Sequence, residues 1–142
     1  MKRRHASLVV MLLGCGPGVH SGGSNAGPAG TFLITAEQIQ RSGARTAWEA
    51  LKQNAPMLTL RDDRNGRPAS MGRRGRSSFL LDEAPVIMLD GVRVPDFHAL
   101  DTIEAQSILT IVIYNGVEGT TYYGTDAVSG VVVIKTKDGR PS

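Results

Sequence analysis

The chain has 142 residues, a length that suits a single domain. Hydrophobic residues make up 41% of it and charged residues 20%, which excludes a disordered chain and a helical membrane bundle. Aromatic residues make up only 5%, and eight membrane strands of about 9–11 residues would fill nearly the whole chain, so a self-contained membrane barrel is not expected. The single Cys excludes a disulfide framework and a Cys-based zinc site.

Residues 1–14 have the pattern of a secretory signal peptide, with a basic start, MKRR, and a short apolar run, ASLVVMLL. This run is too short to cross about 30 Å of hydrocarbon as a helix. It ends in Leu-Leu-Gly-Cys15, which resembles the lipobox of bacterial lipoproteins and implies that lipid is attached to Cys15. The alternative is an ordinary secreted protein that is cut later, near Ser21 or Ala26.

Removal of this leader changes the charge balance. The full chain has 16 basic and 13 acidic residues, and the leader contains three of the basic ones and none of the acidic ones. From Cys15 onward the chain therefore has 13 of each and no formal net charge. Because nucleic-acid-binding proteins usually carry a strong positive surplus, we expect no nucleic-acid partner.

Residues 15–30 read CGPGVHSGGSNAGPAG and show no hydrophobic periodicity. A composition rich in Gly, Ser and Pro predicts a flexible tether between the anchor and a domain over residues 31–139.

The first half of this domain contains two helix-start patterns. Thr35 is followed three residues later by Gln38, and Thr46 by Glu49, which is the spacing of a capping box. The predicted elements are a strand over 31–34, a helix ending at Gly43, a helix stopped by Pro56, a strand over 57–61 and an arginine-rich loop over 62–78.

The second half is dominated by strands. Asp90-Gly91 is a favoured two-residue hairpin turn between strands over 85–89 and 92–94. The predicted elements that follow are a short helix within 95–105, a strand over 107–114, one helical turn within 117–130 and a strand over 131–136 that is apolar enough to be buried on both faces. Helices and strands without strict alternation predict an α+β fold with a small mixed sheet and short flanking helices.

Several segments, taken in order, resemble the plug domain of TonB-dependent outer-membrane receptors, and the resemblance covers residues 34–139. They are the helix pair ending at Pro56, Arg74-Gly75, PVIML followed by Asp90-Gly91-Val92, Tyr123-Gly124, and Gly130 followed by VVVIKTKDG. The residues in these motifs are similar to those of the Bacteroidetes-type glycan and peptide importers. The resemblance implies a plug-like fold and a non-enzymatic binding module without a cofactor. It also marks Asp90, Gly91, Tyr123, Gly124 and Gly130 as structural motif residues.

The sequence differs from such receptors in three places. A receptor continues into a 22-stranded barrel, whereas this sequence ends three residues after Gly139, so transport by this chain alone is not expected. The tether contains no convincing TonB-box segment. Asn115-Gly116 stands where the family usually has Lys-Gly.

A hydrolase is the first alternative, because Ser77, Ser78, His98 and Asp101 are the residue types of a catalytic triad. The sequence has no G-x-S-x-G motif, and His98 is the only His within residues 31–139. We therefore predict a surface or helix-capping role for His98 and no catalytic residues.

A cation site is the second alternative, at the acidic pairs Asp62-Asp63 and Asp82-Glu83. Neither pair has the interleaved oxygen-ligand spacing of a calcium loop, so we predict no metal.

The arginines between residues 61 and 76 form the main binding candidate, with Arg73, Arg74 and Arg76 as its centre. Guanidinium groups bind phosphate or carboxylate through two parallel hydrogen bonds, so lipid headgroups, lipopolysaccharide or an acidic partner would suit them. The alternative is a solvated loop whose charge is balanced by the acidic pairs.

Together these features predict a lipid-anchored plug module on the periplasmic face of the outer membrane, acting as an accessory to uptake. Gly16, rather than Asp, after Cys15 favours outer-membrane sorting. The expected partners are a separately encoded barrel, a TonB-like protein or a second copy. The alternative is a structural envelope lipoprotein that keeps the plug fold without a transport role.

Overall fold

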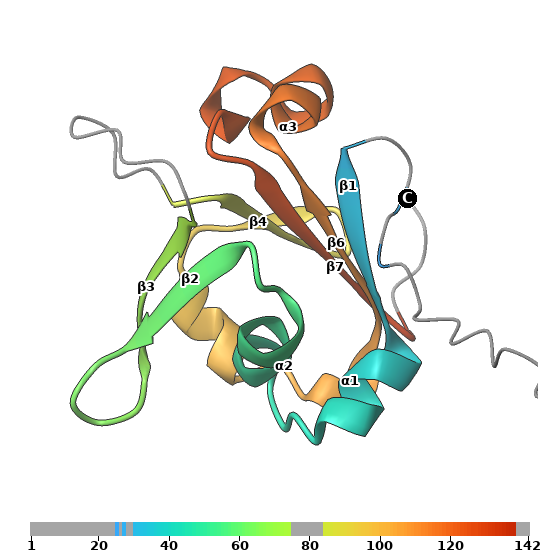
Figure 1. Cartoon of the computed structure of the whole chain (residues 1–142), viewed down its shortest axis with the longest axis vertical. Coiled ribbons are helices and arrows are strands. Elements are labelled where there is room, and N and C mark those ends of the chain that lie inside the picture. Colours follow the sequence, from blue (N-terminus) through green and yellow to red (C-terminus); the bar gives the residue numbers. More distant parts are fainter. Residues whose placement is uncertain (1–24, 26, 28–29, 75–83, 139–142) are drawn as a thin grey trace, which may run out of the picture.

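The computed structural model describes residues 25, 27, 30–74 and 84–138. Its elements form a mixed five-stranded sheet, a separate two-stranded sheet and short helices around them (Figure 1). The strands are β1 (Thr31–Thr35), β2 (Leu58–Asp62), β3 (Pro68–Arg73), β4 (Val86–Leu89), β5 (Val92–Val94), β6 (Ile108–Tyr114) and β7 (Val131–Thr136). The helices are α1 (Ala36–Ser42), α2 (Ala47–Asn54) and α3 (Gly116–Tyr123), and the 3₁₀ turns are η1 (Phe97–Asp101), η2 (Ala105–Ser107) and η3 (Thr125–Ala127).

The five strands are ordered β1-β6-β7-β4-β5. β6 pairs antiparallel with both β1 and β7, whereas β4 and β7 are parallel. A parallel pair needs a crossover connection, and the chain between β4 and β7 contains β5, β6 and α3. This is the mixed α+β architecture that the sequence predicts.

The helix-start predictions are confirmed. The Thr35 side chain accepts a hydrogen bond from Gln38 N, and the Gln38 side chain accepts one from Thr35 N, so the capping box at α1 is complete. Gly43 is the C-cap of α1. At α2, Thr46 caps Glu49 N, but the Glu49 carboxylate accepts from Arg45 N, one residue before the N-cap.

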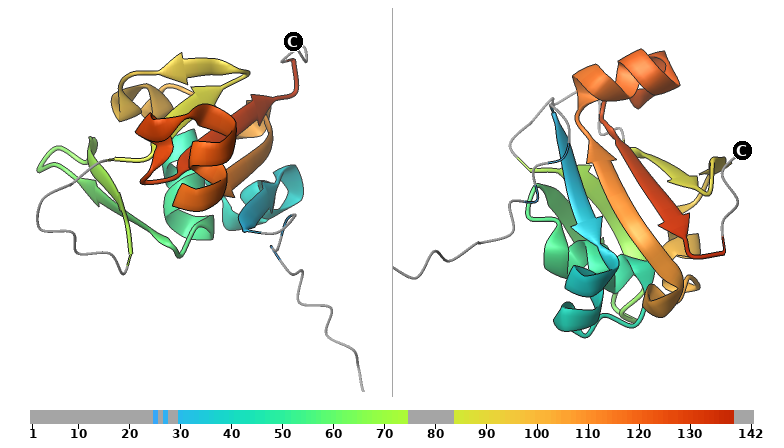
Figure 2. Two further views of the ribbon diagram at one scale, coloured as in Figure 1. Left: turned by 90° about the horizontal axis from the view of Figure 1, so that it is seen from above. Right: turned by 90° about the vertical axis from the view of Figure 1, so that its right-hand side faces the viewer.

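The core lies between the sheet and the helix pair α1–α2 (Figure 2). Ile39 of α1 and Leu51 of α2 are almost completely buried in one cluster with Val132 and Ile134 of β7. A second cluster joins Val131 and other residues on the opposite face of the sheet. β7 is therefore buried on both faces, as its apolar sequence predicts.

Two described residues from the segment predicted as a tether contact β1. Asn25 O accepts a hydrogen bond from Leu33 N at 2.8 Å, and Gly27 N donates to Thr31 O at 3.1 Å. Asn25 Oδ1 also accepts from the Gln38 side chain. These contacts add main-chain pairing to the outer edge of β1.

Two expectations were wrong. Residues 68–73, predicted as loop, form β3, because the backbone of Pro-Ala-Ser-Met-Gly-Arg pairs with β2 although its composition suggests a turn. Residues 116–123 form two turns of helix instead of one. Asn115 starts this helix by accepting hydrogen bonds from Val117 N and Glu118 N.

The Asp90-Gly91 turn adopts the predicted geometry, with φ of 48° at Asp90 and 86° at Gly91. Leu89 pairs with Val92 across it, so the loop has two residues. The Asp90 carboxylate also accepts hydrogen bonds from Thr136, at 2.8 Å from N and 2.7 Å from Oγ1. The turn is thereby fixed to the end of β7, a contact that the sequence analysis did not predict.

Gly130 occupies a second position that only glycine suits. Its φ is 101°, and a Cβ atom there would lie 2.6 Å from Tyr114 O. Gly130 O accepts a hydrogen bond from Val86 N at 3.0 Å. This residue therefore lets the ends of β4, β6 and β7 meet. Gly124, at the end of α3, follows Tyr123, whose ring lies 5.8 Å from that of Tyr114.

We predict that Gly91→Val lowers the free energy of unfolding by more than about 1 kcal/mol, because a β-branched side chain is strained at this φ. The measurement is chemical denaturation of the whole protein. Asp90→Asn is the matched control, because an amide oxygen still accepts from Thr136 N and Asn tolerates positive φ. Equal unfolding midpoints for Gly91→Val and the wild type would contradict this assignment of the turn.

Candidate functional site: the β2–β3 hairpin

β2 and β3 form a hairpin that stands beside the main sheet rather than within it (Figure 1). Its turn is organised by Asp63, whose Oδ1 accepts hydrogen bonds from Asn65 N at 2.8 Å and Arg67 N at 2.9 Å. Asp63 N in turn donates to Arg67 O at 2.8 Å. The N–H groups of Arg67 and Asn65 hold the pKa of the Asp63 carboxyl below its usual value.

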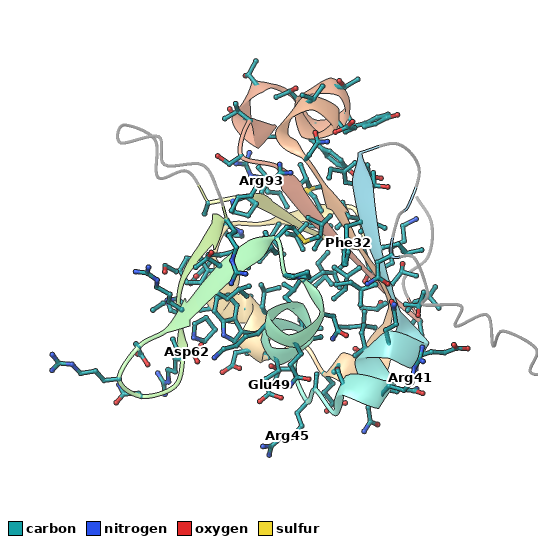
Figure 3. All side chains as sticks on the ribbon, in the orientation of Figure 1. Phe32, Arg41, Arg45, Glu49, Asp62 and Arg93 are labelled. Carbon is teal, nitrogen blue, oxygen red and sulfur yellow. The ribbon has the colours of Figure 1, made fainter. Side chains whose placement is uncertain are left out.

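The hairpin is attached to α2 through one carboxylate, which Figure 3 labels. Asp62 Oδ1 accepts a hydrogen bond from Trp48 Nε1 at 2.8 Å, and Asp62 Oδ2 forms an ion pair with Lys52. The Lys52 ammonium, and then the Trp48 N–H, lower the pKa of Asp62. Trp48 is itself almost fully buried and stacks on Phe97 at 6.1 Å. Asp62 therefore links the turn end of the hairpin to the core.

The two faces of the hairpin differ in chemistry. In an antiparallel pair, residues opposite each other point to the same face. Leu60 opposite Met71 faces the core, where Met71 is buried. The other face contains Arg61 opposite Ser70, and Thr59 opposite Gly72. This outward face has no large apolar side chain.

The arginines of the hairpin are exposed. Asp62 and Asp63, the acidic residues nearest to them in sequence, are already engaged by Lys52 and by the turn backbone. Within residues 30–74 and 84–138, none of these arginines forms an ion pair with a carboxylate. They are Arg61, Arg64, Arg67, Arg73 and Arg74.

Two of the three predicted binding residues, Arg73 and Arg74, lie at the end of β3 and are exposed. Arg73 ends β3, and Arg74 follows it, with Arg74 N donating to Met57 O at 2.8 Å. Arg76 lies outside the described residues. Arg61, Arg64 and Arg67 belong to the same hairpin, which the sequence analysis treated as a strand end and a loop. The signal that could have shown the hairpin is Asp63-Arg-Asn-Gly66, a turn sequence between two runs able to form strands.

The residue types suggestive of a hydrolase do not form a recognisable site in the described chain. His98 is exposed, stacks against Phe97 at 4.9 Å, and places Nε2 4.0 Å from Asp96 Oδ1. Asp96 caps η1 by accepting from His98 N. Asp101, at the end of η1, is exposed, and Ser77 and Ser78 lie outside the described residues.

Both carboxylate oxygens of Asp62 and Oδ1 of Asp63 are bonded to protein groups, and Asp82-Glu83 lies outside the described residues. Within the described part of the chain, no group of three His, Cys, Asp or Glu residues is placed to hold a metal ion. Among the described helices, none is both long enough and apolar enough to span a membrane.

The comparison with known families identifies the class of protein that this fold defines. The family model of the TonB-dependent receptor plug domain matches residues 24–131. The chain belongs to the TonB-dependent receptor plug domain family. No curated protein sequence matches the chain closely enough to serve as a relative.

Solved structures share the fold. The ferric enterobactin receptor PfeA of Pseudomonas aeruginosa, as its Q482A mutant, aligns with a TM-score of 0.56 at 23% identity, over 76% of this chain and 17% of the receptor. The siderophore receptor PirA of Acinetobacter baumannii gives 0.57 at 21% identity, over 78% and 17%. The RagAB peptide importer gives 0.56 at 21% identity, over 79% and 12%. This chain thus spans less than a fifth of each of these proteins. The first two are receptors and the third is a peptide importer.

We predict that Asp62→Asn lowers the melting temperature at neutral pH, because an amide cannot replace the charge opposite Lys52. Since the pKa of Asp62 is lowered on folding, its stabilising effect is present above the unfolded value of 3.8 and is lost as the pH falls through the folded value. The melting temperatures of the wild type and of Asp62→Asn should therefore converge as the solution is made acidic.

Asp63→Asn is the matched control, because an amide oxygen can still accept from Asn65 N and Arg67 N. It should change the neutral-pH melting temperature less than Asp62→Asn does. If both variants have the melting temperature of the wild type at neutral pH, Asp62 does not link the hairpin to α2.

Proposed function

We propose that this plug domain works at the outer membrane as a non-enzymatic, lipid-anchored module that binds a partner as an accessory to uptake. The observation that carries the proposal is the plug family match over residues 24–131, on a fold shared with outer-membrane receptors. The lipobox-like sequence at Cys15 supports anchoring, and Gly16 after it supports sorting to the periplasmic face of the outer membrane.

The proposed binding surface contains Arg73 and Arg74, with Arg76 next to them in sequence. Its partner would be a separately encoded barrel, a TonB-like protein or a second copy of the chain. Exposed charge contacts are weakened by salt, because the Debye length is about 8 Å at physiological ionic strength and shorter above it. Partner binding through this surface should therefore be salt-sensitive.

The anchor is tested by Cys15→Ala in the full-length precursor. The variant should fail to mature or should leave the membrane fraction, because acyl chains contribute roughly 0.8 kcal/mol for each buried methylene. The measurement is membrane fractionation with detection of the attached lipid. Recovery of the wild type entirely in the soluble periplasmic fraction would overturn the proposed anchor.

The binding surface is tested by changing Arg73, Arg74 and Arg76 together to Ala. The triple variant should recover less partner than wild type in a pull-down from membranes, with an unchanged melting temperature, because Arg73 and Arg74 are exposed. The pull-down should also weaken as salt is raised. Undiminished recovery by the triple variant would place partner binding elsewhere.

A truncated chain that begins at residue 24 tests whether the domain folds alone. We expect it to remain soluble and to melt cooperatively, because the core between the sheet and α1–α2 is complete within the chain. Thermal denaturation and size-exclusion chromatography are the measurements. Aggregation that only a co-expressed barrel prevents would instead indicate half of a split receptor.

A further inference from the structure

The β2–β3 hairpin has an excess of positive charge although the mature chain is formally neutral. Residues 58–74 contain five Arg, no Lys and two Asp. One of the two carboxylates is paired with Lys52 of α2, and the other closes the hairpin turn. Within the described chain no guanidinium group of the hairpin forms an ion pair with a carboxylate, although the charge of Arg67 acts on Asp63.

The outward face offers arginine but none of the aromatic or Met side chains that protein interfaces also use. The buried centres of specific protein interfaces are enriched in aromatic residues, Met and Arg. Here the apolar side chains, such as Leu60 and Met71, point inward, and Met71 is buried. The outward positions are Arg61, Ser70, Thr59 and Gly72, so this face offers guanidinium and small polar groups.

Guanidinium groups are suited to oxyanions, since their planar fork matches phosphate oxygens with two parallel hydrogen bonds. The hairpin presents these groups on a firm support, because its turn is closed by Asp63 and the strand end beside the turn is fixed to Trp48 and Lys52 by Asp62. Such a surface can bind a planar array of phosphates without the entropic cost of ordering a flexible loop.

We propose that the outward face and turn of the hairpin, with Arg61, Arg64 and Arg67, bind phosphate groups of an anionic membrane surface. This inference rests on the proposed membrane anchoring, because Asn25 follows Cys15 by ten positions, a stretch of chain that extends at most about 35 Å. A domain of this size has a radius of gyration near 13 Å, so headgroups of the anchoring leaflet are within reach of the hairpin. The contact would set the orientation of the domain at the membrane.

The test is amide hydrogen exchange of the full-length mature protein with vesicles of phosphatidylcholine, with or without phosphatidylglycerol. Exchange at residues 61–67 should slow when phosphatidylglycerol is present, and raising the salt concentration should remove this protection. The comparison is between vesicle compositions for the same protein, so it reports on the hairpin whether or not Cys15 carries lipid.

The triple variant Arg61→Gln, Arg64→Gln, Arg67→Gln should lose this protection. The matched control is Arg41→Gln with Arg45→Gln, two exposed arginines at the α1–α2 side that Figure 3 labels, and it should keep the protection. The salt experiment on wild type needs no substitution, so the proposal stays testable even where the triple variant folds poorly.

Three results would overturn the proposal. The first is equal exchange of the hairpin with both vesicle compositions. The second is equal protection by free inorganic phosphate, which would mean that the surface binds phosphate rather than a membrane. The third is protection that appears only with a co-purified protein. None of these results bears on Cys15, whose role is decided by fractionation.

Discussion

The fold depends on burying β7 on both faces. Residues 131–134 are covered on every side, and β7 pairs with β6 on one edge and β4 on the other. Side chains alternate along a strand, so Val132 and Ile134 enter the main cluster, whereas Val131 and Val133 enter the second. Two separate layers are needed to cover such a strand. The helix pair supplies the first, and Ala127 with its neighbours supplies part of the second.

Residues at the two ends of β7 also hold the strand beside β4. Gly130 precedes β7, and its carbonyl oxygen accepts a hydrogen bond from Val86 N. At the other end of β7, the Asp90 carboxylate accepts hydrogen bonds from N and Oγ1 of Thr136. The parallel β4–β7 pair is therefore held at both ends by groups outside its ladder. A parallel ladder is slightly less stable per residue than an antiparallel one, so these end contacts matter for keeping four-residue β4 in register.

Much of this was predictable because the signals are local. Caps at Thr35 and Thr46, the Asp90-Gly91 turn and the apolar run of β7 each depend on a few adjacent residues. The hairpin was missed because β3 is defined by its pairing with β2. Gly72 has no side chain, so the alternation of apolar and polar residues along β3 is not visible in the sequence. The Asp90–Thr136 contact spans 46 positions in sequence, and no local pattern encodes it. The positions of the hairpin arginines could not be predicted, since they depend on the unpredicted strand β3.

The net charge of the chain does not predict the positive charge of the hairpin surface, and the reason is physical. A carboxylate neutralises an arginine only where it is free to approach it, and the carboxylates closest in sequence have structural tasks. Asp62 is held by Trp48 and Lys52, and the lowered pKa shows that these partners favour its charged form. The carboxylate of Asp62 thus interacts with side chains of α2, and the carboxylate of Asp63 accepts hydrogen bonds from two backbone N–H groups. The interactions that build the hairpin therefore also occupy the carboxylates nearest to its arginines in sequence, so the stability of this element and the basicity of its surface arise together.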